Sequence, residues 1–408
     1  DLLARIQRKN LASGQSHYRF GDERGGFMAI DSIPARLFQQ AEKQGSAPAY
    51  YVRKGSSWSP TSWQEYSAKT WQAAKAIIAL GMKEGGTVSI LGFNKPEWVI
   101  VDVACMAAGG APAGIYTTCS ANEVQYIINH AESMMVLLEN EEQWAKVDAE
   151  RSNLPELKYA VMMEGAPKID DPMVLSWEEF LAKGDEVEDS VLEERMNKLE
   201  EDQMATLIYT SGTTGPPKAV MLSHKNLTWT ASSAKDLVEN THEDCSLSYL
   251  PLSHIAEQMF SIHGPITVGS KVYYAESIEK VADNLKEVQP HVVFAVPRIW
   301  EKFYAAVSSK LQLATGAKAK LVAWARGVGE KVSELKNRGG EPTGLLALQY
   351  ALASKLIFSK LKPALGLGRA RVCVSGAAPI QPEILRFFAS LDIRIHEVYG
   401  QSEDCGPT

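Results

Sequence analysis

The sequence predicts an α/β fold in which helices cover both faces of parallel-rich sheets. Short apolar runs bounded by turn residues alternate with helical patterns along most of the 408-residue chain, and the connections between them are short. This alternation is typical of parallel strands joined by covering helices. The length is enough for two or three compact units, each with its own core.

The first half of the chain contains two local signals for the start of a helix. In a capping box, a serine side chain binds the backbone N–H three residues later, and a glutamate there binds back. Ser62 with Glu65 and Ser120 with Glu123 fit this pattern. The elements expected in this half are helices over 33–43, 62–81, 96–108 and 120–130, strands over 50–52, 88–91, 111–115 and 134–138, and an acidic, solvated helix and loop over 184–202.

The second half continues the same alternation. Its expected elements are strands over 246–252, 272–274, 291–295, 371–375 and 394–398, and helices over 226–237, 297–307, 315–338 and 381–390, with one more helix between 274 and 291. The helix over 315–338 is rich in Lys and Arg, which either form a solvated face or contact an anionic membrane surface. The solvated face is favoured, because no clear apolar stripe accompanies the charge.

Composition excludes several classes of protein. The net charge of −7 gives no electrostatic footprint for a nucleic-acid partner. No signal peptide is visible, and the most apolar window, 98–116, is too interrupted by Asp102, glycines and a proline to span a bilayer. The five cysteines are scattered without a C-x-x-C pair, which favours reduced thiols in a cytoplasmic protein. The chain begins at Asp1 rather than Met, which predicts a fragment or a processed form.

The most informative stretch is 207–224. An apolar run leads into six consecutive Thr, Ser or Gly residues, followed by two prolines, Lys218 and a second apolar run. Glycines permit close backbone approach, and successive free N–H groups make a concavity that binds anions. A phosphate cradle is therefore predicted. The alternative, a solvent-exposed linker, is disfavoured because linkers are not normally held between two apolar runs.

The spacing excludes a P-loop. That motif needs G-x-x-x-x-G-K followed by Ser or Thr, whereas Gly212 and Gly215 are three apart and Ala219 follows the lysine. The run Tyr209-Thr-Ser-Gly-Thr-Thr-Gly-Pro-Pro-Lys218 instead resembles the phosphate-binding loop of the adenylate-forming enzymes. These include acyl-CoA synthetases, firefly luciferase and peptide-synthetase adenylation domains.

Four later motifs match the same family in the same order, so the resemblance covers most of the chain from about residue 50. They are Leu250-Pro-Leu-Ser-His254, Val296-Pro-Arg-Ile-Trp300, Ser375-Gly-Ala-Ala-Pro379 and Val398-Tyr-Gly-Gln-Ser-Glu403. Taken alone, His254 would read as a structural hydrogen-bonding residue and Trp300 as a core residue. Two near-misses carry no function: Gly366-Leu-Gly368 lacks the third glycine of a dinucleotide motif, and there is no G-x-S-x-G elbow.

The resemblance implies a role for each matched position. The positions that would bind the ATP phosphates are Thr210, Ser211, Gly212, Thr213, Thr214 and Lys218. Ser402 would lie near the α-phosphate. Those of the adenine motifs are Gly376, Ala377, Ala378, Tyr399, Gly400 and Gln401. His254 and Glu403 are the catalytic residues, Glu403 with Thr210 holds Mg²⁺, and Trp300 gates a fatty-acid tunnel. Ala377 replaces a commoner Gly and Ser402 a commoner Thr, and both are expected to fit.

The resemblance implies a long-chain fatty acid–CoA ligase that uses ATP, Mg²⁺ and CoA. No acidic residue lies between 250 and 256 to hold an amino-acid substrate. Phrases such as Leu-Ser-His-Ile-Ala-Glu-Gln and Val-Pro-Arg-Ile-Trp-Glu-Lys look most like the bubblegum branch. The alternatives are a non-catalytic short form that binds nucleotide or acyl groups, and another acid–CoA ligase of this superfamily. The resemblance leaves peripheral membrane contact open.

Family members continue beyond the last motif, whereas this chain ends at Thr408. The continuation holds an Asp for the ribose hydroxyls, an Arg, a hinge and a lid with the adenylation lysine. The resemblance therefore implies that 1–408 is an incomplete N-terminal AMP-binding domain. Its subdomains would be about 62–240, ending with the phosphate loop, and 241–408, with the small β-barrel subdomain and lid absent or incomplete. Such a chain is expected to bind ATP poorly and to turn over little.

Overall fold

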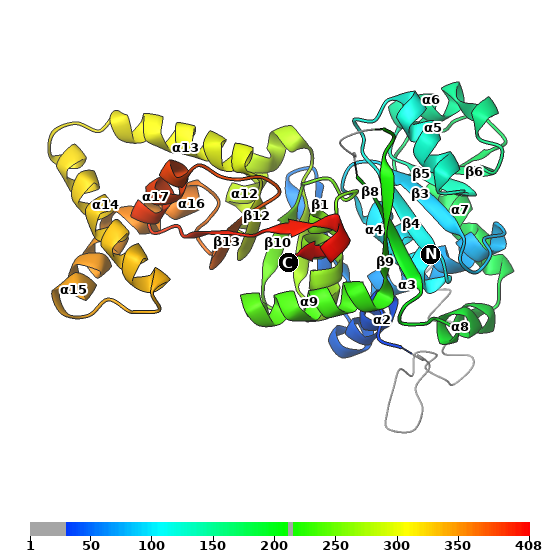
Figure 1. Ribbon diagram of the computed structural model, residues 1–408, viewed down its shortest axis with the longest axis horizontal. Helices are drawn as coiled ribbons and strands as arrows, with labels where there is room; N and C mark the ends of the chain where they lie inside the picture. Colours follow the sequence, from blue (N-terminus) through cyan, green and yellow to red (C-terminus); the bar gives the residue numbers. More distant parts are fainter. Residues whose placement is uncertain (1–29, 211–214) are drawn as a thin grey trace. The chain divides into compact units, whose positions relative to one another are not determined.

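The computed structural model describes residues 30–210 and 215–408 (Figure 1). The chain folds into two compact units, each built from several stretches of sequence. The first unit comprises residues up to 242, 248–274 and 402–406, and the second comprises 243–247, 275–401 and 407–408. The division into subdomains 62–240 and 241–408 stays a prediction.

A seven-stranded sheet is the centre of the first unit. Its strands are β3 (Thr87–Leu91), β4 (Ala111–Ile115), β5 (Met135–Leu138), β6 (Tyr159–Met162), β7 (Val174–Leu175), β8 (Met204–Thr210) and β9 (Lys218–Ser223). They lie in the order β7-β6-β5-β3-β4-β8-β9, and every neighbouring pair is parallel except β8 and β9. The parallel-rich sheet expected from the sequence is confirmed.

Consecutive side chains of this sheet enter cores on its two opposite faces. On β5, Met135 and Leu137 belong to one core, whereas Val136 and Leu138 belong to the other. The first core is covered by α3 (Trp63–Ala79) and α4 (Pro96–Ala107), and the second by α5 (Ala121–His130) and α6 (Glu141–Ala149). A parallel sheet requires this burial on both faces.

Both predicted capping boxes are formed. Glu65 N donates to Ser62 Oγ over 3.2 Å, and Ser62 N donates to Glu65 Oε2 over 2.8 Å. Ser120 and Glu123 repeat the arrangement at 3.4 and 2.8 Å. Helices α3 and α5 therefore begin where the sequence predicts.

The first unit contains further elements besides this sheet and its covering helices. They are α2 (Ile33–Gln44), β1 (Pro48–Lys54), β2 (Ser57–Ser62), η1 (Arg151–Asn153), α7 (Trp177–Lys183), η2 (Gly184–Glu186), α8 (Asp189–Asn197), α9 (His224–Val238), α10 (Ile255–Gln258), the π-helix η3 (Met259–His263), α11 (Gly264–Val268), β11 (Lys271–Tyr274) and η6 (Ser402–Asp404). Strand β1 pairs antiparallel with β2 and parallel with β11. The strand predicted over 246–252 is shorter in the structure, where β10 (Cys245–Ser248) spans the passage from one unit to the other.

Helix α8 carries the acidic run that was predicted to be solvated. One of its faces is buried, because Leu192 and Met196 belong to the first-unit core. Asp189 also forms an ion pair of 2.7 Å with Lys75, whose side chain is only 8 % exposed. The helix is present as predicted and most acidic residues of the run are exposed, while two apolar residues one turn apart anchor its other face in the core.

The second unit contains a three-stranded parallel sheet in the order β12-β13-β14. Its elements are η4 (Ile278–Lys280), α12 (Val281–Val288), β12 (Val292–Ala295), α13 (Pro297–Gln312), α14 (Gly316–Asn337), α15 (Gly344–Ala353), the π-helix η5 (Ser354–Phe358), α16 (Ser359–Ala364), β13 (Val372–Ser375), α17 (Pro382–Ser390), β14 (Ile395–Glu397) and β15 (Gly400–Gln401); β16 (Gly406–Pro407) ends the chain. Helices α13 and α17 cover the sheet through a core that includes Trp300, Phe387 and Phe388.

The basic helix α14 has an apolar stripe of its own. Ala325, Val328 and Val332 are buried and pack with Ala353 and Phe358 of the following helical segment. The stripe is therefore used inside the second unit, and α14 does not offer it to solvent. Within residues 30–210 and 215–408, no helix combines the length and apolar character that crossing a bilayer would need.

Candidate functional site

The predicted phosphate loop joins two antiparallel strands. Thr210, the last residue of β8, lies opposite Lys218, the first residue of β9, in the register of the pair. The Lys218 side chain is exposed, with no hydrogen bond or ion pair to any of the residues described. Ser211, Gly212, Thr213 and Thr214 lie outside the described residues. The structure therefore brings together the two ends of the predicted cradle and leaves a free cation at one of them.

Helix α5 fastens both ends of this loop. Tyr126 donates a hydrogen bond of 3.1 Å to the carbonyl oxygen of Pro217, just before Lys218. One turn later, His130 Nδ1 and the Tyr209 hydroxyl form a hydrogen bond of 2.9 Å. The rings of Tyr126 and His130 stack with their centroids 5.4 Å apart. Sequence reasoning missed both residues, although their spacing of four on a predicted helix places them on one face.

A buried carboxylate shapes the chain just before His254. Glu257 Oε1 accepts hydrogen bonds from Ser248 Oγ at 2.8 Å and Ser261 Oγ at 2.7 Å, and from Tyr249 N at 3.2 Å. Asn94, which follows β3, donates to Ser248 Oγ at 2.8 Å and to the Leu250 carbonyl at 2.7 Å. Burial raises the pKa of Glu257 to about 7, and these donors limit the rise. Sequence reasoning missed this network, because Asn94 is 154 residues from Ser248.

Strand β4 packs directly against the segment that precedes His254. Ser253 lies so close to Gly114 that a Cβ added there would be 2.9 Å from its Cα. Any side chain at this position of β4 would push the His254 stretch away from the sheet. Glycine is thus required for the close approach, which sets the height of the stretch above the carboxyl end of β4.

His254 is held in one tautomer. Its Nδ1 accepts a hydrogen bond of 3.1 Å from Ala256 N and so caps α10. Burial lowers the pKa of the imidazole, so the ring is neutral near pH 7 and carries its proton on Nε2. Among the described residues, Nε2 has no hydrogen-bond partner, and the ring is only partly buried. His254 therefore presents an N–H donor, which suits a carboxylate or phosphate oxygen.

The segment 402–406 returns to the first unit and packs beside β9. Its helical turn η6 contacts that strand, and Cys405 is buried in the core, where its thiol forms a hydrogen bond with Thr230 of α9. The Glu403 carboxylate is exposed, without a hydrogen bond or ion pair to the described residues. The structure thus places Ser402 and Glu403 against the strand that begins with Lys218.

A magnesium ion would fit Glu403. It has hard oxygens, which Mg²⁺ prefers, and Mg²⁺ is commonly bound by one or two protein carboxylates together with substrate phosphates. Within the described residues there is no cluster of three or more His, Cys, Asp or Glu side chains that could hold a metal. Glu403 with Thr210 would provide the protein's ligands to such an ion.

The predicted adenine residues belong to the second unit. Gly376 directly follows β13, and a Cβ added there would lie 2.7 Å from Val398 Cγ1, so only glycine fits without displacement. Ala377 has a φ of 67°, in the left-handed region that favours glycine. The Ala377 and Ala378 side chains are exposed, and the Tyr399 ring is 72 % exposed. This edge offers small residues and a free aromatic face, but the substitution at Ala377 is strained.

Trp300 is a core residue in this structure. Its side chain is fully buried, and its indole N–H donates to the Val374 carbonyl over 3.3 Å. The ring packs edge-on against Phe388 at a centroid distance of 5.4 Å and against Phe303 at 5.9 Å. The role of Trp300 as a tunnel gate stays a prediction.

Comparison with known proteins gives a consistent result. A family model described as AMP-binding enzyme matches residues 37–408. The long-chain-fatty-acid–CoA ligase ACSBG2 of Homo sapiens is 40 % identical over 381 residues, which are 92 % of this chain and 57 % of that protein. ACSBG2 of Xenopus laevis is 39 % identical over 380 residues, or 91 % of this chain and 51 % of that protein. The long-chain-fatty-acid–CoA ligase ACSBG1 of Homo sapiens is 34 % identical over 380 residues, which are 91 % of this chain and 52 % of that protein.

The chain spans about half the length of the curated relatives that it matches. Among solved structures, the inhibitor-bound N-terminal domain of FACL13 from Mycobacterium tuberculosis matches with a TM-score of 0.64 at 19 % identity, covering 92 % of this chain and 77 % of that one. The A-PCP didomain of carboxylic acid reductase from Segniliparus rugosus, in complex with AMP, matches with a TM-score of 0.68 at 17 % identity, covering 98 % and 57 %. These likenesses confirm the predicted fold class.

Proposed function

Because the chain belongs to the AMP-binding enzyme family, we propose that it is the substrate- and ATP-binding part of a long-chain fatty acid–CoA ligase of the bubblegum type. One observation carries the proposal above the others. The free cation of Lys218 and the free carboxylate of Glu403 lie on β9 and on the turn packed beside it. The names of the relatives, which are long-chain-fatty-acid–CoA ligases, support the choice of substrate.

The reaction follows from the chemistry of a carboxylic acid. A carboxylate is a poor electrophile, because its carbonyl is electron-rich and oxide is not a usable leaving group. In the first step its oxygen attacks the α-phosphorus of ATP, the bond from that phosphorus to the bridging oxygen breaks, and acyl-AMP and pyrophosphate form. In the second step the sulfur of CoA attacks the acyl carbon, its proton is lost, and AMP leaves with the electrons of the broken C–O bond.

The first unit would bind the phosphates and the reacting carboxylate. Lys218 and the backbone that follows Thr210 attract the β- and γ-phosphates, while the Ser402 hydroxyl donates toward the α-phosphate. Magnesium bound at Glu403 and Thr210 would supply charge neutralisation on the phosphate oxygens. His254 donates its Nε2 proton as a hydrogen bond to the carboxylate or adenylate oxygen, which its neutral tautomer permits. These residues contribute positioning and electrostatic stabilisation, the main requirements of phosphoryl-centre displacement.

The second unit would hold the adenine and part of the acyl chain. Gly376, Ala377 and Ala378 supply a flat edge for the base, and the exposed ring of Tyr399 a stacking face worth about 1–3 kcal/mol per base. Trp300 is assigned to the acyl tunnel on its motif alone. CoA is the second substrate, and we also propose that the protein works at the periphery of membranes, where long-chain acids partition.

ATP–pyrophosphate exchange with palmitate tests the proposal in a version of the protein extended to the length of its relatives. Exchange should depend on palmitate and should fall at least about 100-fold in Lys218→Ala and in Glu403→Gln, since each removes a charge that acts on the phosphates. Lys225→Ala, an exposed lysine on the neighbouring helix α9, is the matched control and should leave exchange unchanged. Nucleotide binding without exchange for any fatty acid would favour the non-catalytic alternative.

A further inference from the structure

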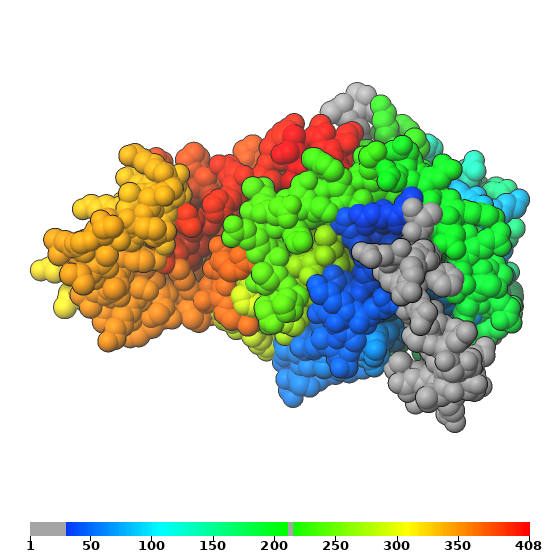
Figure 2. Space-filling model, turned by 90° about the horizontal axis from the view of Figure 1, so that it is seen from below, coloured from blue at the N-terminus to red at the C-terminus, as the bar shows by residue number. Residues whose placement is uncertain are grey.

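Helix α15 exposes a row of leucines. Leu345 is 72 % exposed, Leu348 70 % and Leu352 49 %. Their spacing of three and four places them on one side of the helix, which we call the α15 leucine face. Figure 2 shows the segment that contains α15, in orange, on the surface of the second unit. Single exposed leucines are ordinary, but three on one face indicate a surface that is covered in the working protein.

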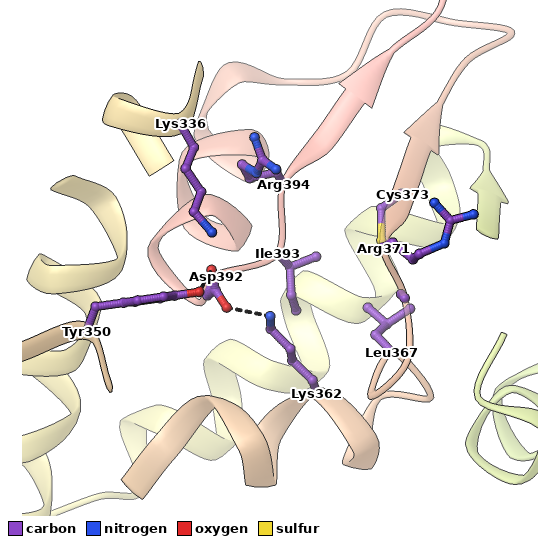
Figure 3. Close-up of a pocket in the computed structure, with 10 residues that line it drawn as sticks. Lys336, Tyr350, Lys362, Leu367, Arg371, Cys373, Asp392, Ile393 and Arg394 are labelled. Carbon is purple, nitrogen blue, oxygen red and sulfur yellow. Dashed lines mark hydrogen bonds and ion pairs between the residues drawn. The ribbon is translucent and has the colours of Figure 1, made fainter. Parts of the chain in front are cut away.

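The opposite side of α15 is fixed to the second unit, so the leucine face is held outward. Tyr350 reaches into a cavity of about 160 Å³, where its hydroxyl donates to Asp392 over 3.0 Å (Figure 3). Lys362 forms an ion pair of 2.5 Å with the same carboxylate. The ammonium of Lys336 lies 5.2 Å from the centre of the Tyr350 ring. With these anchors, α15 cannot bury its leucines by rolling over without breaking a charged network.

The segment that carries the leucine face is positively charged. Residues 313–364 hold nine Lys or Arg residues against three Glu, although the whole chain has a net charge of −7. Lys355, which continues the spacing of the leucines, and Lys360 are exposed and have no ion pair within the described residues. The cavity behind the helix adds to this field, because Arg394 lines it with its guanidinium free of partners among the described residues. Positive charge beside apolar side chains complements an anionic lipid surface.

We propose that the α15 leucine face, with Lys355 and Lys360, docks the protein onto an anionic phospholipid bilayer. This inference deepens the membrane part of the proposed function and rests on it. The leucines enter the boundary between head groups and acyl chains, while the lysines neutralise lipid phosphates. The surface lies in the helical part of the second unit, on residues to which the proposed reaction gives no role. Its loss should therefore leave adenylation of a water-soluble acid intact.

Co-sedimentation with vesicles tests the surface directly. The chain should bind vesicles that contain phosphatidylserine more tightly than vesicles of phosphatidylcholine alone. The double variant Leu345→Ser with Leu348→Ser should weaken binding to both by at least about tenfold, since the apolar contact is lost. Lys355→Gln with Lys360→Gln should weaken binding to the anionic vesicles by about fivefold per residue at low salt, and should change binding to neutral vesicles little.

Matched controls come from the first unit. Leu237→Ser replaces a leucine that is 85 % exposed on α9, and Lys225→Gln removes an exposed charge from the same helix. Both controls should bind vesicles as the original chain does. Leu348→Trp gives a second readout that does not depend on losing stability: its fluorescence should shift to shorter wavelength on vesicles with phosphatidylserine and should stay unchanged with soluble inorganic phosphate.

Several results would overturn the proposal. These are absence of vesicle binding, leucine variants that bind like the original chain, and a dimer in solution that the leucine variants dissociate. The proposal would also be overturned if, in the extended version of the protein, the tryptophan of Leu348→Trp were buried and vesicle binding were lost. Exchange with octanoate, measured in the same variants, separates the two proposals. Retained exchange with lost vesicle binding supports the docking surface, whereas lost exchange in the original extended protein would count against the ligase.

Discussion

Tyr126 donates its phenolic proton to the carbonyl oxygen of Pro217 over 3.1 Å, and thereby connects helix α5 to the end of the predicted phosphate loop. The next turn of the same helix holds Tyr209, at the other end of that loop, through His130. Two residues one turn apart thus hold both ends of a stretch that, in the proposed function, presents its backbone N–H groups to phosphates. Such positioning matters for catalysis because a small displacement of binding groups can lower rates strongly.

Tyr126→Phe should weaken the productive binding of ATP with little effect on stability. The substitution removes one hydrogen bond, of about 0.5–1.5 kcal/mol, and leaves the ring that stacks on His130. We expect kcat/KM for ATP in pyrophosphate exchange to fall by about three- to tenfold in the extended protein. Tyr304→Phe, which removes a hydroxyl 3.4 Å from Glu383 in the second unit, is the control. Equal exchange in Tyr126→Phe and the original protein would refute the positioning role.

Ala377→Gly should stabilise the second unit. Ala377 has a φ of 67°, where an L side chain is strained by about 1–2 kcal/mol. Glycine relieves this strain but adds about 0.4–1 kcal/mol of unfolded-state entropy, so a net gain of about 0.5–1 kcal/mol is expected. Ala378 does not have a positive φ, so Ala378→Gly should lower the stability of the second unit. Urea unfolding of both variants measures the difference, and a loss of stability in Ala377→Gly would contradict the prediction.

Glu257→Gln should change how stability depends on pH. Burial raises the pKa of Glu257 from 4.5 to about 7, so between these values the folded state binds more protons than the unfolded state. The stability that Glu257 contributes is therefore fully present below about pH 4.5 and declines as the pH rises through 7. Relative to the original protein, the glutamine variant should gain roughly 2–3 kcal/mol between about pH 5 and 8.

Urea unfolding across this pH range provides the measurement for Glu257→Gln. Glu301→Gln, which makes the same charge change on an exposed position of α13, corrects for the net charge. A difference between Glu257→Gln and the original protein that stays constant with pH would show that the Glu257 carboxylate ionises normally in the folded state.

His224→Phe should change the pH dependence of stability in the opposite direction, within a similar pH range. His224 is fully buried, and among the described residues neither ring nitrogen has a hydrogen-bond partner. Burial lowers its pKa from 6.5 to about 4, so below pH 6.5 the unfolded state binds the extra proton and the folded state loses stability as the pH falls. Phenylalanine cannot be protonated. Thermal unfolding should show an advantage for His224→Phe that grows by about 1.4 kcal/mol per pH unit between 6.5 and 4.

Local signals in the sequence predicted much of the first unit correctly. The capping boxes at Ser62 and Ser120 depend on residues only three apart, so they can be recognised in the sequence without knowledge of the fold. The elements that were missed have weaker local signals. Strand β2 contains Pro60 and three serines, which read as a turn, and it forms because it is the outer partner of β1. Helix α15 is apolar on all sides and gives no helical period.

The candidate site divides in the same way. Lys218, His254 and Glu403 were predicted as site residues because they stand in recognisable motifs. Glu257 and Asn94 were missed because their importance arises from a contact between helix α10 and the loop after β3, which are far apart in sequence. The strain at Ala377 also needed the backbone angle, since an alanine in place of glycine looks harmless in a sequence. Pattern reasoning therefore points to groups proposed to contact a ligand more readily than to groups that hold them in place.

The return of residues 402–406 to the first unit has a consequence for biosynthesis. Cys405 is part of the core that begins near Ile33, so this core is completed only after residue 405 has left the ribosome. Domains generally fold as units during synthesis. The first unit must wait for the second to be translated, with the side of β9 that contacts η6 uncovered in the meantime. Slow translation between 275 and 401 should therefore prolong the time for which a nascent chain needs chaperone protection.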